Sequence, residues 1–152
     1  MKCCTFIGHR DCSVQIYDKL YSEIETMITV ENVKKFYVGT NGNFDKMVYR
    51  ILKVLENEYQ IEVNVVLAYL NFKTENVYFD IADTIFPDIL EKTPFRFAIN
   101  RRNEYMIKNS HYIICCVDNT LTNSYKYIEI ALRNKLKIIN IGSLDIKKTL
   151  SG

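Results

Sequence analysis

The sequence predicts an α/β fold built on a doubly wound, mostly parallel sheet of about five strands, with helices on both faces. Two observations support this prediction. Apolar runs of strand length alternate with amphipathic stretches of helical period, and these runs are near-continuous, as in strands buried on both faces. Right-handed crossovers then favour the strand order 3-2-1-4-5, with the switch point between strands one and four. With 152 residues, the chain is expected to form a single domain, residues 1–152.

Each expected strand is a short apolar run, and most of these runs stop at a glycine or a polar residue. Runs of this kind, bounded by turn-forming residues, are typical of strands in a parallel sheet. The expected strands span residues 2–7, 35–38, 62–68, 112–117 and 137–141.

Each expected helix carries apolar residues at spacings of three and four. In the second helix, Phe44, Met47, Val48 and Ile51 fall on one stripe. Such a stripe packs against a sheet and requires no ligand. The expected helices span residues 14–29, 43–58, 100–109 and 123–134.

The segment 69–96 interrupts the alternation of strands and helices. It is long for a connection, it is rich in aromatic residues, and it contains both prolines, Pro87 and Pro94. Two interpretations stay open. The segment is either a lid over a ligand or a loop with a short helix, residues 80–90, packed on the edge of the sheet.

Composition and charge restrict the classes of function. The net charge of +2 gives no electrostatic argument for nucleic acid, so a nucleic-acid partner is not expected. No apolar run approaches the ~20 residues that span a bilayer, and the N-terminus shows no secretion signal. We therefore expect a cytoplasmic protein that does not associate with membranes.

The cysteines are expected to be reduced, small, buried side chains. Their odd number, five, and the absence of a secretion signal argue against a disulfide framework. Neighbouring cysteines on a strand point to opposite faces, so they do not readily share a metal ion. We expect no metal site and no cofactor, and Cys12 is a candidate reactive thiol because it lies beside the loop described next.

The first candidate site follows the first strand, where Gly8, His9 and Arg10 form a turn. In an open α/β sheet, ligands bind at the carboxyl ends of the strands. Arg10 would stand there beside free backbone N–H groups, which suits a phosphate or a carboxylate. His9 is either an acid/base group or a loop residue that bonds only to backbone.

A second candidate is the turn Gly39-Thr40-Asn41-Gly42 before the second helix. Its glycines permit positive φ, and its amides can face an anion. It lacks the Gly-Lys-Ser/Thr of a Walker motif and the spacing of GxGxxG. Asp45 is either part of this site or a residue that complements the helix dipole.

Two further polar clusters lie near the expected fourth strand. Arg101 and Arg102 precede it and offer bidentate geometry for a phosphate, or else form a solvated helix face. Asn119 and Ser124 follow it and can bind a ribose or phosphate, or cap a helix. Glu129, in the next helix, is either solvent-facing or a ribose ligand or general base.

Taken together, these motifs resemble the SLOG superfamily, the Rossmann-like group that includes the LOG-type phosphoribohydrolases and the DprA/Smf proteins. The resemblance covers nearly the whole chain and is greatest for small, single-domain, uncharacterised bacterial members. It rests on Phe6-Ile7-Gly8-His9-Arg10, on the loop Gly39-Thr40-Asn41-Gly42, and on the run from Arg102-Asn103 to Ser110. One departure is clear: residues 118–129 contain none of the glycines of the LOG-type Pro-Gly-Gly-x-Gly-Thr-x-x-Glu loop.

The resemblance implies a domain that binds a nucleotide or nucleotide-derived ligand, and it implies a homodimer. Phosphate would sit on residues 39–42 and Arg10, assisted by Arg101 or Arg102, and ribose would meet Asn119, Ser124 or Glu129. The alternative is a hydrolase of the N-glycosidic bond of nucleoside phosphates, with Glu129 as its catalytic carboxylate. A DNA-binding or protein-interaction module is a third hypothesis.

Overall fold

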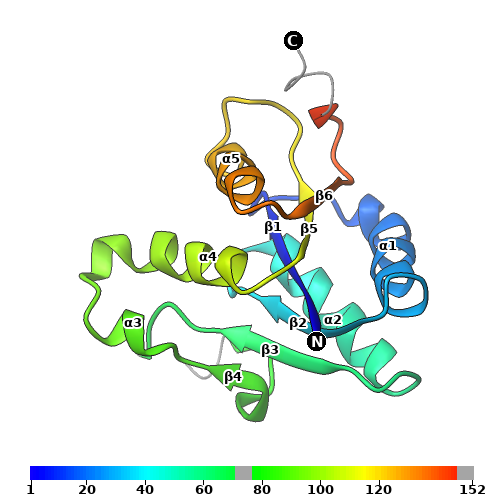
Figure 1. The fold of residues 1–152 in the computed structure, drawn as a ribbon, viewed down its shortest axis with the longest axis horizontal. Helices are drawn as coiled ribbons and strands as arrows, with labels where there is room; N and C mark the ends of the chain where they lie inside the picture. The colour runs from blue at the N-terminus through cyan, green and yellow to red at the C-terminus, as the bar shows by residue number, and fades with distance from the viewer. Residues whose placement is uncertain (71–76, 147–152) are drawn as a thin grey trace.

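Six parallel strands form the central sheet in the computed structural model, which describes residues 1–70 and 77–146 (Figure 1). Their order is β4-β3-β2-β1-β5-β6. The predicted order of five strands is therefore confirmed, and β4 adds a sixth strand at one edge. The bounds are β1 Lys2–Gly8, β2 Val33–Val38, β3 Glu62–Val66, β4 Thr84–Ile85, β5 Tyr112–Cys116 and β6 Lys137–Asn140.

Helices cover both faces of the sheet, as predicted (Figure 1). Two of them, α1 and α2, pack on one face, and α4 and α5 pack on the other. Within the described part of the chain, no helix has the length and apolar character needed to cross a membrane. The bounds are α1 Tyr17–Thr29, α2 Asn43–Glu56, α3 Asp88–Glu91, α4 Ala98–Lys108 and α5 Tyr125–Arg133.

Strand β1 lies in the middle of the sheet and shows why the strands are apolar throughout. Cys4 and Phe6 pack into the core formed with α1 and α2, whereas Cys3 and Ile7 pack into the core on the α4 and α5 side. Side chains alternate between the two faces of a strand, so both faces need apolar residues when both are covered. The carboxyl end of β1 is thereby fixed between two layers of helices.

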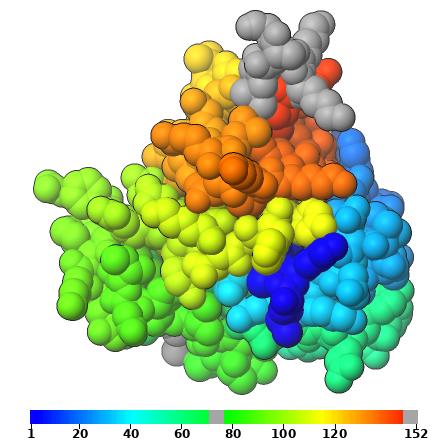
Figure 2. Space-filling view, in the orientation of Figure 1, coloured from blue at the N-terminus to red at the C-terminus, as the bar shows by residue number. Residues whose placement is uncertain are grey.

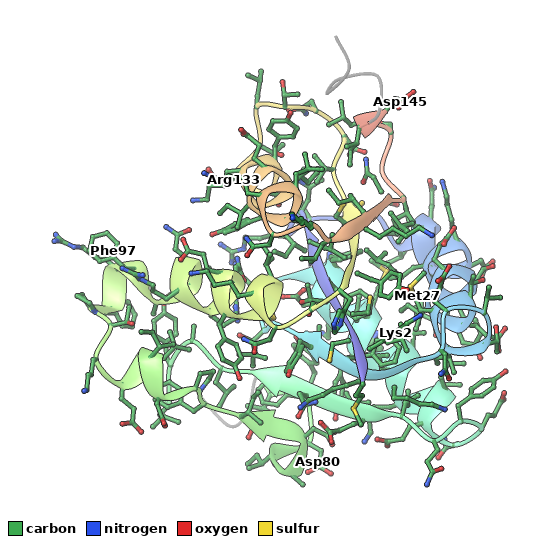
Figure 3. All side chains as sticks on the ribbon, viewed as in Figure 1. Lys2, Met27, Asp80, Phe97, Arg133 and Asp145 are labelled. Atoms are coloured by element: carbon green, nitrogen blue, oxygen red, sulfur yellow. The ribbon has the colours of Figure 1, made fainter. Side chains whose placement is uncertain are left out.

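Within the segment 69–96, the prediction of a short helix over residues 80–90 was wrong. Thr84 and Ile85 pair with β3 and form the edge strand β4, and Pro87 separates β4 from the single turn of α3. The Tyr69 ring stacks on Phe95, with 4.3 Å between centroids. Residues 71–76 lie outside the described residues, so only the rest bears on the two interpretations. The described part of the segment extends the edge of the sheet through β4 and leads to Phe97, which Figure 3 shows at one end of the molecule.

Candidate ligand-binding site

One cavity of about 670 Å³ opens at the carboxyl end of β1. The β1 loop, the β2–α2 loop, α4 and the start of α5 all contribute to it. The structure places these predicted site residues in its lining: Gly8, His9, Arg10, Asn41, Asp45, Arg102 and Ser124. It also brings in Asp11, Asn100, Lys126 and Tyr127, which the sequence did not single out, together with Asn103 and Asn123, the neighbours of Arg102 and Ser124 in the polar clusters of the sequence.

Arg102 is the charged group built most deeply into the site. It is 1% exposed, and its Nε donates to Asn103 Oδ1 at 2.8 Å. Its Nη1 donates to Thr40 Oγ1 and to the Val66 carbonyl, each at 3.2 Å. Among the described residues, no partner is found for Nη2, and Arg102 lines the cavity. Nε and Nη1 of a buried guanidinium are thus held by the protein, at a position on the cavity lining.

Gly39 and Thr40 support Arg102 and do not line the cavity. A Cβ atom on Gly39 would lie 2.9 Å from both Arg102 Cζ and Asp45 Oδ2, so only glycine lets these two charged groups lie over this turn. Thr40 accepts the hydrogen bond from Arg102. These two residues therefore position the arginine, and the expectation that phosphate binds directly on them stays a prediction.

Asp45 is a buried carboxylate on the cavity lining. It is 7% exposed, and its Oδ2 accepts a hydrogen bond from the Asn41 N–H at 2.8 Å. Burial raises its pKa to about 6, against the opposing effects of Arg102 and of the Asn41 amide. Near neutral pH the cavity therefore contains a carboxyl group that can gain or lose a proton.

Gly42 holds the β1 loop in place. Its φ is +92°, and a Cβ there would lie 2.5 Å from Arg10 Cα. The next amide, Asn43 N–H, donates to the Arg10 carbonyl at 2.6 Å. Gly42 therefore packs against the backbone of Arg10 and does not line the cavity, while the Arg10 side chain is exposed at its rim.

His9 connects the β1 loop to the loop after β5. Its Nε2 accepts a hydrogen bond from the Asp118 N–H at 3.2 Å, and the Asp118 carboxylate lies 3.8 Å away. Of the two interpretations of His9, the structure shows the bond to backbone. Because its ring also lines the cavity, His9 fixes one wall of the site.

The opposite wall comes from α4 and α5, which lie against each other in Figure 2. Tyr127, buried on α5, donates its hydroxyl hydrogen bond to Asn100 Oδ1 on α4. Both residues line the cavity. Sequence analysis missed them, although Tyr127 lies three residues after Ser124, a spacing that places both on one face of a helix.

Besides Gly39, Thr40 and Gly42, three more predicted residues lie outside this cavity. Glu129 is exposed on α5, about 200° around the helix axis from Tyr127, so its predicted catalytic role is not supported by its position. Arg101 is exposed and lies 4.0 Å from Glu104, and so only Arg102 of the pair enters the site. Asn119 is exposed and accepts a hydrogen bond from the Leu121 N–H, which is a local turn contact.

Comparison with known proteins supports the fold. No protein-family model matches this chain. Among solved structures, it is similar to the X-ray structure of DNA processing protein A (DprA) from Streptococcus pneumoniae, with a TM-score of 0.66 and 17% sequence identity. The match covers 99% of this chain and 53% of that one, so this chain spans about half the length of that protein. The chain therefore has a DprA-like, Rossmann-like fold, which is the fold that the SLOG resemblance implies.

Proposed function

We propose that this protein binds a nucleotide or a nucleotide-derived ligand in the cavity at the carboxyl end of β1. One observation carries the proposal: a buried guanidinium, Arg102, and an exposed one, Arg10, line the same cavity. Guanidinium groups bind phosphate through paired, charge-assisted hydrogen bonds. The position agrees with the general rule that ligands of open α/β sheets bind at the carboxyl ends of the strands.

The other lining groups suit the sugar and base of such a ligand. Asn100, Asn103 and Ser124 offer amide or hydroxyl groups, and the Asp45 carboxylate can accept a hydrogen bond from a ribose hydroxyl. The cavity of about 670 Å³ lies within the usual range for small-molecule sites, roughly 300–1,000 Å³. Phosphate would meet Arg10, Arg102 Nη2 and Lys126.

A thermal-shift screen against nucleoside mono-, di- and triphosphates and cyclic nucleotides tests this proposal. A ligand at ~100 times its Kd stabilises the fold by about 2.7 kcal/mol, which raises the Tm of a chain of this size by roughly 5–11 °C. Arg10→Ala should weaken the best ligand by roughly ten- to a hundred-fold. Arg101→Ala is the matched control, because Arg101 is equally exposed but lies outside the cavity. Equal losses in both variants would contradict the assignment of Arg10.

Nucleic acid is the competing ligand in the same screen. The neighbour named above is a DNA processing protein, so an oligonucleotide belongs among the compounds tested. The small net charge of +2 favours the nucleotide. Stabilisation by single-stranded DNA and by no free nucleotide would replace our proposal with a nucleic-acid-binding module.

A second candidate function is hydrolysis of the N-glycosidic bond of a nucleoside phosphate. The position and the raised pKa of Asp45 favour it. An acid/base group works best when its pKa is close to the working pH, and Asp45, with a pKa of about 6, lies in the cavity. Chromatography of the bound nucleotide tests this. Release of free base by the wild type and not by Asp45→Asn would support hydrolysis, whereas recovery of intact nucleotide would leave binding alone.

We also propose that the protein acts as a homodimer in the cytoplasm, an assembly and location that rest on the SLOG resemblance. Size-exclusion chromatography with light scattering measures the oligomeric state. A monomer at working concentrations would contradict the proposed dimer and leave the ligand proposal untouched.

A further inference from the structure

Two thiols from distant parts of the chain are in direct contact beside the candidate site. Cys12, in the loop after β1, and Cys116, the last residue of β5, are 104 positions apart, and their Sγ atoms are 2.6 Å apart. Both are buried in the core cluster shared with α1 and α2. Cys115 belongs to a separate cluster and directs its Sγ to the Ile139 carbonyl, so it is not part of this contact.

The contact also creates unequal thiols. Either thiol can donate the hydrogen bond that joins them. This contact lowers the pKa of Cys116, and the same contact together with burial raises the pKa of Cys12. The thiolate is the reactive form of cysteine, so the direction of these two pKa shifts favours Cys116 as the attacking thiol. Burial and the Asp118 carboxylate act against the thiolate of Cys116, and Lys19 favours it.

A small oxidant has a route to this pair. A second cavity, of about 560 Å³, is lined by both cysteines together with Lys19 and Asp118. Its lining also includes His9, which faces the main cavity as well. The thiols are therefore buried from bulk solvent but adjacent to a space that can hold a peroxide molecule.

We propose that Cys12 and Cys116 form a reversible intramolecular disulfide when the protein meets hydrogen peroxide. The Cys116 thiolate attacks one peroxide oxygen, the O–O bond breaks, and the released hydroxide takes a proton to become water. Cys12 then attacks the sulfur of the resulting sulfenic acid, the S–S bond forms, and the hydroxyl leaves as a second water with the proton of Cys12. Two thiols are oxidised, and one peroxide is reduced to two waters.

The disulfide would lock the β1 loop to the end of β5. Cys12 follows His9 and Arg10 by three and two residues, and its N–H already approaches the His9 carbonyl at 3.4 Å. The His9–Asp118 bond joins the same two segments without a covalent link. Formation of the disulfide does not depend on the ligand proposed above, and the two are tested separately.

The experiment treats the reduced, purified protein with increasing hydrogen peroxide and follows thiol content, intact mass and Tm. We expect loss of two of the five thiols and of two hydrogen atoms in the monomer mass, both reversed by dithiothreitol. Closing a loop of this length should raise the Tm by roughly 5–15 °C over the reduced form. Retention of all five thiols, or linkage only between two chains, would overturn the proposal.

Peptide mapping identifies the linked pair. Tryptic residues 11–19 contain Cys12, but residues 109–126 contain both Cys115 and Cys116, so a variant must separate the last two. Cys115→Ala is the matched control and should keep the linked peptides and the rise in Tm. Cys12→Ala and Cys116→Ala should each abolish both. A link that survives in Cys12→Ala, or disappears in Cys115→Ala, would refute the assignment.

Discussion

Replacing Asp45 by asparagine tests the electrostatics of the cavity, because the change removes a buried charge and keeps the shape. The carboxyl has a pKa of about 6 in the folded protein, raised by burial from its ordinary 3.8. Between these two values the folded state binds more protons than the unfolded state, so the free energy of unfolding falls as pH rises through this window. From the two pKa values, the destabilisation by Asp45 is about 1 kcal/mol at about pH 4.5 and about 3 kcal/mol at about pH 7.5.

The expected result is a difference that grows with pH. The stability of Asp45→Asn relative to the wild type should increase by about 2 kcal/mol between about pH 4.5 and about pH 7.5, or roughly 4–8 °C in Tm. Urea denaturation at several pH values measures this difference in the free energy of unfolding. Comparing the pH values removes any part of the difference that does not depend on pH. Asp88→Asn is the control, because Asp88 is exposed in the first turn of α3. A difference that stays constant with pH, or shrinks as pH rises, would refute the reasoning.

Three further variants probe how the site is held together. Arg102→Met leaves the buried Asp45 without its neighbouring positive charge, so the free energy of unfolding should fall by about 3–5 kcal/mol. Part of this loss should be recovered in the double variant that also carries Asp45→Asn. Gly42→Ala should cost about 2–4 kcal/mol, because φ is +92° and the new Cβ would meet the Arg10 backbone at 2.5 Å; an unchanged Tm would contradict this contact. Tyr127→Phe removes the hydrogen bond to Asn100 and should lower the free energy of unfolding by about 1 kcal/mol. If the two groups act as one pair, the double variant Tyr127→Phe with Asn100→Ala should lose less than the sum of the two single losses.

The fold was accessible from the sequence because its main elements obey simple periodicities. The apolar strands and their alternation with helices predicted the order that the five long strands adopt. The edge strand β4 was missed because Thr84 and Ile85 are too few residues to show a pattern of their own. They form a strand because the edge of β3 is available beside them, and this tertiary contact replaces the short helix that one interpretation placed over residues 80–90.

The residues that line the site were harder to predict, because a sequence motif does not specify the direction in which each side chain points. Arg101 and Arg102 look equivalent in the sequence, yet only Arg102 shares its helix face with the buried residues Ala98 and Met106. That spacing of four was present in the sequence and would have selected the correct arginine. Burial of a charged group on an apolar stripe needs compensating partners, and Asp45 comes from a different element.

The turn at residues 39–42 has a consequence for how a phosphate would be bound. In a glycine-rich phosphate loop, backbone N–H groups face the anion. Here the Asn41 N–H bonds to Asp45, and the Asn43 N–H bonds to the Arg10 carbonyl, so both amides are already used within the protein. In the complex we propose, phosphate would therefore gain little from these two amides and would be held chiefly by side chains, above all by the two guanidinium groups. Recognition of this kind discriminates between ligands by charge, so a nucleotide should bind much more tightly than the nucleoside that lacks its phosphate.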